Sequence, residues 1–194
     1  MDRSRSGRSP IVARRPRAGG RHQGRSTPWR RHFDPSAIAR SLVAVVQWPG
    51  SSSVHDRSWR LVARTSDFDA WLISWPGGTT ADLHDHGGSR GALHVIRGSM
   101  VETIPWRDDR GSVTFARREV HSGATLAFGA GHVHDVRNEA AEHALSLHVY
   151  SPPLDSMSYY DRSGDNLIPR ENGWVPPRDQ TSSDDRSISR LVAP

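Results

Sequence analysis

From Trp59 onward the sequence consists of short runs of strand-forming residues separated by closely spaced turn residues. Nine such runs lie between positions 59 and 150, and Gly, Pro, Asp and Ser are frequent in the breaks between them. The runs are Trp59–Arg64, Phe68–Trp75, Leu83–His86, Gly91–Arg97, Ser99–Trp106, Ser112–Val120, Ala124–Phe128, His132–Arg137 and Ala144–Tyr150. Many short strands at this spacing predict an all-β sandwich or closed barrel.

One helix is predicted ahead of the strands, over Asp34–Trp48. Asp34 suits the N-cap and Pro35 the first helical position, whereas Pro49 and Gly50 end the segment. The apolar residues that recur on one face of this helix are Ile38, Leu42, Val45 and Val46. The sequence therefore predicts a β-rich domain with a short N-terminal helical segment.

The 194 residues divide into an Arg-rich tail at 1–31 and a single domain at 32–194. The tail holds ten Arg and one acid, whereas the rest holds 16 Arg and 20 Asp and Glu, so the net charge of +5 belongs to the tail. Its composition and lack of periodicity predict disorder. We favour a dispensable extension, or a start codon assigned too far upstream. A nucleic-acid-binding arm is disfavoured because no aromatic residue before Trp29 could stack on bases, and a targeting segment because a continuous apolar stretch is missing.

Two absences restrict the location and chemistry of the protein. No apolar run approaches the roughly 20 residues of a membrane span, so a soluble, cytoplasmic protein is expected. The chain has no Cys, which removes disulfides, Cys-ligated metals and a Cys nucleophile. Any metal centre must therefore use His and carboxylates. Beyond the strands, we expect residues 162–186 to be mostly irregular and Ile188–Val192 to form a late edge strand.

His84 and His86 form an H-x-H pair in a predicted strand. Residues two apart in a strand point to the same face, so the two imidazoles converge while Asp85 points away. Such a pair can chelate Fe, Zn, Cu or Ni, although an isolated H-x-H is more often incidental. Here the pair has glycines at characteristic distances, because Gly78 precedes His84 by six residues and Gly98 follows His86 by twelve.

A second spaced group follows downstream, at intervals of six, two, three and four residues. Its members are Gly123, Gly129, Gly131, His134 and Asn138. The two groups together resemble the motifs of the cupin superfamily, G-x5-H-x-H and G-x5-P-x-G-x2-H-x3-N. Gly129 replaces the Pro, and Arg90 or Gly91 stands where the first motif has Glu. The resemblance implies a cupin barrel, of the double-stranded β-helix or jelly-roll-like type, whose one metal ion is held by His84, His86 and His134.

Three imidazoles without a carboxylate leave coordination positions free for substrate and O2, a pattern similar to that of the thiol dioxygenases. From about Trp59 to Asp161 the chain resembles the cysteine dioxygenase family in its bacterial form. The matching residues are His84-Asp85-His86, Gly98, Glu102, His134-Asp135-Val136-Arg137-Asn138 and Ser146-Leu147-His148-Val149-Tyr150-Ser151-Pro152-Pro153. The resemblance implies an Fe(II) enzyme that oxidises L-cysteine with O2 to cysteine sulfinic acid. His132, on the same predicted strand face as His134, is a weaker candidate for the third ligand.

Ser146, His148 and Tyr150 occupy alternate positions of one predicted strand and therefore share a face. Hydrogen bonds can pass along such a row from hydroxyl to imidazole to phenol. The family resemblance implies that the row lies beside the iron, and that Tyr150 contacts substrate or oxygen while His148 and Ser146 hold it in place. It also implies that Arg60 binds the substrate carboxylate, with Arg64 as the substitute candidate.

Two alternative functions stay open from the sequence. The first is a 3-mercaptopropionate dioxygenase, with the same site and a substrate that lacks the amine; an Arg at the carboxylate position favours cysteine. The second is a non-catalytic metal-binding cupin that serves as an effector-binding module, against which the complete Ser-His-Tyr row argues. We expect a monomer whose partners are a small thiol and O2. Gly91 stands where many relatives link a Cys to the Tyr, so this chain lacks that crosslink. Trp71 and Trp75 are expected to fill the barrel core.

Overall fold

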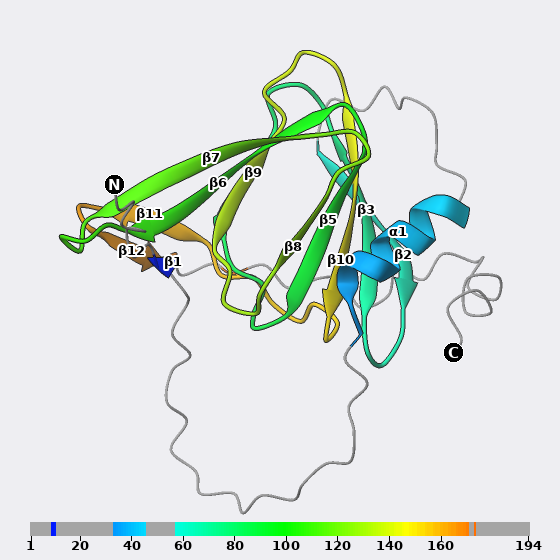
Figure 1. Cartoon of the computed structure of the whole chain (residues 1–194), viewed down its shortest axis with the longest axis horizontal. Coiled ribbons are helices and arrows are strands. Elements are labelled where there is room, and N and C mark those ends of the chain that lie inside the picture. Colours follow the sequence, from blue (N-terminus) through cyan, green and yellow to red (C-terminus); the bar gives the residue numbers. More distant parts are fainter. Residues whose placement is uncertain (1–8, 11–32, 46–56, 171–172, 174–194) are drawn as a thin grey trace, which may run out of the picture.

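The computed structural model describes residues 9–10, 33–45, 57–170 and 173 as two antiparallel sheets that face each other, with one helix outside (Figure 1). Sheet I has the order β2 (Ser58–Arg64), β3 (Asp69–Trp75), β10 (Ala144–Ser151), β5 (Arg90–Arg97) and β8 (Thr125–Phe128). Sheet II has the order β1 (Ser9–Pro10), β6 (Ser99–Arg107), β9 (His134–Arg137) and β4 (Thr80–His84), and β7 (Val113–His121) also pairs with β6. A separate hairpin consists of β11 (Tyr160–Ser163) and β12 (Asn166–Pro169).

The two sheets are joined by an apolar core between their inner faces. The buried core residues from sheet I are Trp75, Leu93, Val95 and Ala144, and those from sheet II are Ala81, Met100, Val120 and Val136. Burial of this kind is the main favourable contribution to folding, at roughly 25 cal/mol for each Å² of apolar surface removed from water. It fixes the distance between the sheets and therefore the width of any cavity between them.

The helix α1 (Pro35–Val45) covers the outer face of sheet I. Its N-cap is the predicted one, since the backbone N–H of Ser36 donates to Asp34 Oδ1 at 2.9 Å. Ile38 and Leu42 are buried in the same cluster as Leu147 of β10. The prediction that Val45 also lies on the buried face is wrong: Val45 is 53% exposed, at the last turn of the helix. Residues 46–48 lie outside the described part of the chain.

Strand β10 is the central element for the site, because it pairs with β3 on one side and β5 on the other along its whole length. All eight of its residues are buried. Leu145, Leu147 and Val149 belong to the core beneath α1. Strand alternation therefore turns the intervening polar side chains toward the space between the sheets; these are Ser146, His148 and Tyr150.

The predicted all-β class with a short N-terminal helix is confirmed, and all nine predicted strands are present with small shifts at their ends. The sheets form a sandwich rather than one continuously hydrogen-bonded closed barrel. The prediction of irregular structure after residue 162 is wrong in part, because β11 and β12 form a hairpin there. Its turn contains Gly164, whose φ of +56° suits a two-residue hairpin turn.

Two predictions fall mainly on residues that the structure does not describe. The edge strand expected at 188–192 lies outside the described residues, as does the tail apart from Ser9 and Pro10, which pair with Arg107 and Trp106 of β6. In the described ranges, no helix is both long enough and apolar enough to cross a membrane.

Candidate metal centre

Three histidines converge between the sheets. His84 ends β4, His86 follows it by two residues, and His134 begins β9, where it lies directly opposite His84 in the antiparallel pairing. The centroids of the three rings are 4.8 to 5.0 Å apart. One nitrogen from each ring lies within 4.8 Å of the others, and all three side chains are buried. This arrangement could place three imidazole ligands around one metal ion.

The expected strand alternation explains only part of this convergence. Strand β4 ends at His84, so Asp85 and His86 lie beyond the strand, and the prediction of a strand through His86 is wrong. Likewise β9 starts at His134 rather than at His132. The cross-strand register between β4 and β9, not the alternation within one strand, brings His84 and His134 together.

Several ring nitrogens in this cluster are buried without a hydrogen-bond partner among the described residues. They are both nitrogens of His86 and the Nε2 atom of His134. A buried polar atom without a partner costs free energy, and such atoms are rare in native proteins. A metal ion bound between the rings would use the lone pair of His134 Nε2 and the single lone pair of the neutral His86 ring. The donor set therefore fits a divalent metal that accepts imidazole ligands.

The Nδ1 atoms of His84 and His134 lie within hydrogen-bonding distance of acceptor oxygens. His84 Nδ1 lies 3.0 Å from the carbonyl oxygen of Ala81 and 2.6 Å from that of Asp82. His134 Nδ1 lies 2.7 Å from Glu102 Oε1. A neutral ring that donates through Nδ1 keeps its lone pair on Nε2, which is the usual arrangement of a histidine that binds a metal.

Burial keeps these rings neutral. Loss of solvent lowers the pKa values of His84 and His86 well below the usual value, and neighbouring imidazoles lower them further. Burial also lowers the pKa of His134, although the Glu102 carboxylate opposes this effect. Neutral imidazole is the form that binds a metal, so the site needs to lose few protons when it is loaded.

Glu102 on β6 is a buried carboxylate that orients His134. Its Oε1 atom accepts from His134 Nδ1 and, at 3.0 Å, from His132 Nε2, while Oε2 pairs with Arg118. Burial by itself would raise the pKa of Glu102, but the hydrogen bonds from His132 and His134 outweigh it and hold the pKa well below the usual range. His132 thus binds Glu102, the carboxylate that orients His134, and is not one of the three converging rings.

Replacing Glu102 with Gln is expected to weaken metal binding by about 10- to 100-fold, the usual effect of losing a carboxylate behind a ligating histidine. The amide keeps the shape of the side chain but not its charge. The measurement is a Co(II) titration followed by absorption spectroscopy. Glu139→Gln, which removes an exposed carboxylate paired with Arg117, is the matched control and should bind Co(II) normally. Equal affinities in the two variants would show that Glu102 does not support the ligand.

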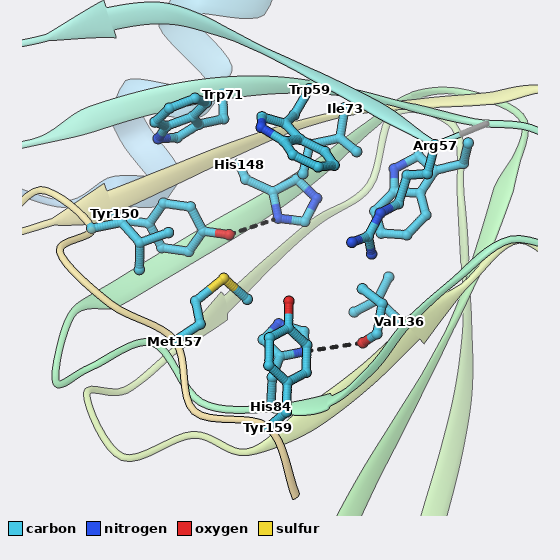
Figure 2. A pocket seen from close by; sticks show the side chains of 13 residues that line it. Arg57, Trp59, Trp71, Ile73, His84, Val136, His148, Tyr150, Met157 and Tyr159 are labelled. Atoms are coloured by element: carbon cyan, nitrogen blue, oxygen red, sulfur yellow. Dashed lines mark hydrogen bonds between the residues drawn. The ribbon is translucent and has the colours of Figure 1, made fainter. Parts of the chain in front are cut away.

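A cavity of about 80 Å³ lies beside His84 (Figure 2). This is room for a few water molecules or one small organic molecule. The residues that line it are Arg57, Trp59, Trp71, Ile73, Trp75, Ala81, His84, Val136, His148, Tyr150, Leu154, Met157 and Tyr159. Trp71 and Trp75 are buried as expected, but they also form part of the cavity wall. Most of the wall is apolar, and the cationic group on it is Arg57.

Four side chains form a continuous hydrogen-bonded row along this cavity. Trp75 Nε1–H donates to Ser146 Oγ at 2.8 Å, Ser146 Oγ lies 2.9 Å from His148 Nε2, and His148 Nδ1 lies 3.2 Å from the Tyr150 hydroxyl. The structure thus brings the three residues of the predicted row together in the expected order. Trp75, which extends the row, was not predicted, because it lies on β3, 71 residues before Ser146.

The fixed donor at one end favours one direction of hydrogen bonding along the row. An indole N–H can only donate, so the Ser146 hydroxyl accepts from Trp75 and keeps its own proton to donate to His148 Nε2. Burial lowers the pKa of His148 to about 3, so the ring is neutral and carries a single proton. In the tautomer that accepts from Ser146 at Nε2, this proton lies on Nδ1 and is donated to the Tyr150 oxygen. Burial raises the pKa of Tyr150 well above its usual value, so the Tyr150 hydroxyl keeps its proton and can donate it into the cavity.

The neutral His148 ring predicts a loss of stability in acid for the metal-free protein. Its pKa is about 3 in the folded state against 6.5 ordinarily, so between these pH values only the unfolded chain binds the proton. The free energy of unfolding should fall as pH decreases, by about 1.4 kcal/mol per pH unit from this residue, and should not depend on it above pH 6.5. Urea titrations across this range should give a shallower slope for His148→Gln. An identical slope in both proteins would contradict the prediction.

Arg57, rather than Arg60, reaches the cavity. Arg60 pairs with Leu72 on the outward face of sheet I and is exposed, so the structure does not bring it to the site. Alternation along this segment instead turns Arg57 and Trp59 inward. Arg57 lies at the cavity wall (Figure 2). Its Nη1 atom donates to the carbonyl oxygen of Thr80 at 3.0 Å, which holds the guanidinium in place. Arg57, Arg60 and Arg64 lie within eight residues of the sequence, and which of them faces the cavity depends on the strand pairing, which the sequence alone does not give.

Arg64, the substitute candidate for binding the substrate carboxylate, makes its contacts outside the cavity. Its Nη2 atom lies 2.8 Å from Oδ2 of the buried Asp69, and its guanidinium carbon lies 5.5 Å from the Trp71 ring centroid. It is not among the residues that line the cavity. The ion pair with Asp69 is therefore its principal contact.

Asp85, between two of the histidines, holds the segment that covers the site. This segment, residues 154–160, is called the strap. Asp85 Oδ1 accepts from the backbone N–H groups of Gly87 at 3.0 Å and Ser158 at 3.2 Å, and Oδ2 accepts from the Tyr160 hydroxyl at 2.5 Å. Asp85 points away from the imidazoles as predicted, but toward the strap and not toward solvent.

A steric clash explains why residue 91 is a glycine. A Cβ atom at this position would lie 2.5 Å from the Phe128 ring and 2.8 Å from the carbonyl oxygen of Val149. Phe128 in turn stacks on His86, with ring centroids 4.6 Å apart, and lies 6.2 Å from the Tyr150 ring. The absence of a side chain at Gly91 therefore makes room for the ring that packs against a metal-site histidine.

The facing sheets and the three convergent imidazoles between them define a metal-binding cupin. The family model described as "Cysteine dioxygenase type I" matches residues 52–163, which is more than half of the chain. The chain belongs to this family.

Curated relatives agree with this assignment. Cysteine dioxygenase type 1 of Rattus norvegicus and that of Homo sapiens are each 30% identical over 101 residues, which are 49% of this chain and 50% of the relative. That of Danio rerio is 29% identical over 115 residues, 55% of this chain and 57% of the relative. The chain thus matches about half the length of these curated relatives.

Solved structures with a similar arrangement are more distant. A cupin family protein with a double-stranded β-helix fold from Methanocaldococcus jannaschii is 14% identical, with a TM-score of 0.43 over 55% of this chain and 90% of that chain. A protein from Thermus thermophilus is 22% identical, with a TM-score of 0.44 over 54% of this chain and 90% of that chain.

Proposed function

We propose that the protein is an Fe(II)-dependent thiol dioxygenase that oxidises L-cysteine with O2 to cysteine sulfinic acid. The observation that carries this proposal is that three neutral imidazoles, with buried ring nitrogens that lack a partner, lie beside a small cavity. That cavity is lined by Arg57 and by the Tyr150 hydroxyl, which His148 holds in place. His84, His86 and His134 are the proposed ligands. When bound, Fe(II) supplies a redox-active centre with open positions for a thiolate and O2.

The protein's own groups would bind and orient the substrate. Arg57 is the cavity's guanidinium and would bind the substrate carboxylate through paired, charge-assisted hydrogen bonds. Tyr150, with its proton free, would donate a hydrogen bond to the reacting oxygen or sulfur, while His148 and Ser146 hold its oxygen in place. The apolar wall made by Trp71, Trp75 and other residues would exclude water from the reacting atoms.

One observation keeps a second substrate in consideration. The residues that line the cavity include no Asp or Glu, so the described wall provides no carboxylate for the amine of cysteine. 3-Mercaptopropionate, which lacks the amine, would meet the same Arg57. A non-catalytic effector-binding cupin has less support, because binding alone would not need the directed row that ends at Tyr150.

The test is anaerobic reconstitution with Fe(II), followed by oxygen uptake with L-cysteine and with 3-mercaptopropionate side by side. The product should carry two added oxygen atoms by mass spectrometry. A preference for either thiol would identify the substrate. If iron is bound and neither thiol consumes oxygen, the proposed dioxygenase activity is wrong and a binding role becomes the better account.

Arg57→Met is expected to raise the KM for the thiol substrate by about 10- to 100-fold, the usual cost of a lost hydrogen bond to a charged group. Methionine keeps much of the apolar stem and removes only the charge and donors. The matched control is Arg60→Met, three residues along and exposed on the other face of sheet I, which should leave the KM unchanged. A raised KM in the Arg60 variant instead would return the carboxylate site to the residue predicted from the sequence.

A further inference from the structure

A second phenol reaches the cavity from the side opposite β10. Tyr159 belongs to the strap and lines the cavity together with Met157 (Figure 2). The close-up shows its hydroxyl directed toward the middle of the cavity, while the Tyr150 hydroxyl enters from the strand wall. Neither the motifs in the sequence nor the row on β10 gives this residue a role.

The Tyr159 hydroxyl is available to a ligand. In the described part of the chain it makes no hydrogen bond to another residue, whereas the Tyr160 hydroxyl binds Asp85 and the Tyr150 oxygen accepts from His148. A hydroxyl offers one donor and two acceptor positions. As far as the described residues go, this donor and these acceptor positions are therefore open to water or a bound molecule.

Tyr159 is also held firmly in position. Its backbone forms an antiparallel bridge with His84, and its ring centroid lies 5.8 Å from that of His84. On either side, Ser158 exchanges backbone and carboxylate hydrogen bonds with Asp85, and Tyr160 binds the same carboxylate. A hydroxyl on a fixed backbone can bind a ligand group without a large loss of side-chain entropy.

We propose that Tyr159 is a substrate-binding residue, whose hydroxyl donates a hydrogen bond to the carboxylate that Arg57 binds and whose ring limits the length of the thiol. The inference rests on the proposed function and adds to it the recognition of the carboxylate end. Among the described residues that line the cavity, Arg57 is the cation and Tyr159 is a hydroxyl donor that no other described residue occupies. A guanidinium leaves carboxylate lone pairs free for a further donor, which Tyr159 supplies.

The ring of Tyr159 also sets the size of the ligand. With Met157 it forms the strap side of a cavity of about 80 Å³, so a longer thiol would collide with the two side chains. Outward movement of the strap would break the hydrogen bonds of Ser158 and Tyr160 to Asp85 and the backbone bridge between Tyr159 and His84. Shortening residue 159 should therefore admit longer thiols.

The test compares three probes in the metal-loaded full chain: 3-mercaptopropionate, L-cysteine and cysteamine, which has no carboxylate. Anaerobic binding is followed by tryptophan fluorescence, since Trp59, Trp71 and Trp75 line the cavity, and turnover is followed separately by oxygen uptake. Tyr159→Phe should bind the two carboxylate thiols roughly tenfold more weakly and bind cysteamine as the wild type does. Tyr159→Ala should in addition bind homocysteine, which we expect the wild type to exclude.

Tyr160→Phe is the matched control, because it removes the neighbouring phenol that holds the strap but does not line the cavity. It should weaken all three probes alike, as a purely structural change would. If Tyr159→Phe behaves in the same way, or binds every probe with wild-type affinity, the proposed role of Tyr159 is wrong. If the wild type binds carboxylate thiols but oxidises none of them, the dioxygenase proposal fails while the binding comparison still decides the role of Tyr159.

Discussion

Replacing His86 with alanine is expected to reduce the affinity for Fe(II) or Co(II) by more than about 100-fold, since even partners behind a ligand contribute up to that much. His86 is 1% exposed, and both of its ring nitrogens lack a partner among the described residues. His132, the neighbouring imidazole in the described part of the chain, is already bound to Glu102 and is not positioned to replace it. Thiol oxidation should be lost together with the metal. The measurement is a Co(II) titration, with iron content and oxygen uptake measured on the same preparations.

The matched control is His94→Ala, which also removes a buried imidazole. His94 lies on β5, and its Nδ1 atom lies 2.8 Å from Thr125 Oγ1, outside the three-histidine cluster. It should keep metal binding while it loses some stability. Normal Co(II) affinity in His86→Ala would mean that the unpartnered nitrogens of His86 do not bind the metal and that the site is built differently.

Tyr150→Phe is expected to keep the metal and the thiol but to reduce kcat by about 100-fold or more, within the range of proton-donating groups. The reason is the direction of the row from Trp75: it leaves the Tyr150 proton as the one that points into the cavity. Phenylalanine preserves the ring and its packing against Phe128 and His86. Single-turnover oxidation, measured after anaerobic loading with thiol, separates this step from binding.

Ser146→Ala gives an independent check, because it interrupts the row two groups away from the cavity. It should also reduce kcat, but by a smaller factor, because the Ser146 hydroxyl then no longer favours the tautomer with the His148 proton on Nδ1. Metal and thiol affinities should stay unchanged in both variants. If kcat in Tyr150→Phe equals that of the wild type, the hydroxyl takes no part in the reaction and the row serves only to fill the interior.

The sequence predicted the strands better than the register between them. Alternation and turn residues are local signals, so all nine strands from β2 to β10 were found. The end of β4 at His84 and the position of Arg57 depend on cross-strand pairing, which local signals do not contain. The hairpin of β11 and β12 was missed because each strand has only four residues; β11 contains the polar residues Asp161, Arg162 and Ser163, and β12 ends at Pro169.

The same distinction applies to the site. The three histidines and the row on β10 have spacings that recur in a known family, so they could be named in advance. Glu102 was part of the family resemblance, but its hydrogen bond to His134 was not predicted. The contacts of Trp75 and Tyr159 join residues far apart in the chain, and no spacing rule identifies them.

The two walls of the cavity differ in how they are held. Strand β10 is hydrogen-bonded along both edges and buried at every residue, so its amide protons should be among the last to exchange with solvent. The strap is held instead by the bonds to Asp85 and a short backbone bridge to His84. Attempts to change which ligands the cavity accepts should therefore leave the strand unchanged and vary the strap residues that line the cavity, Met157 and Tyr159.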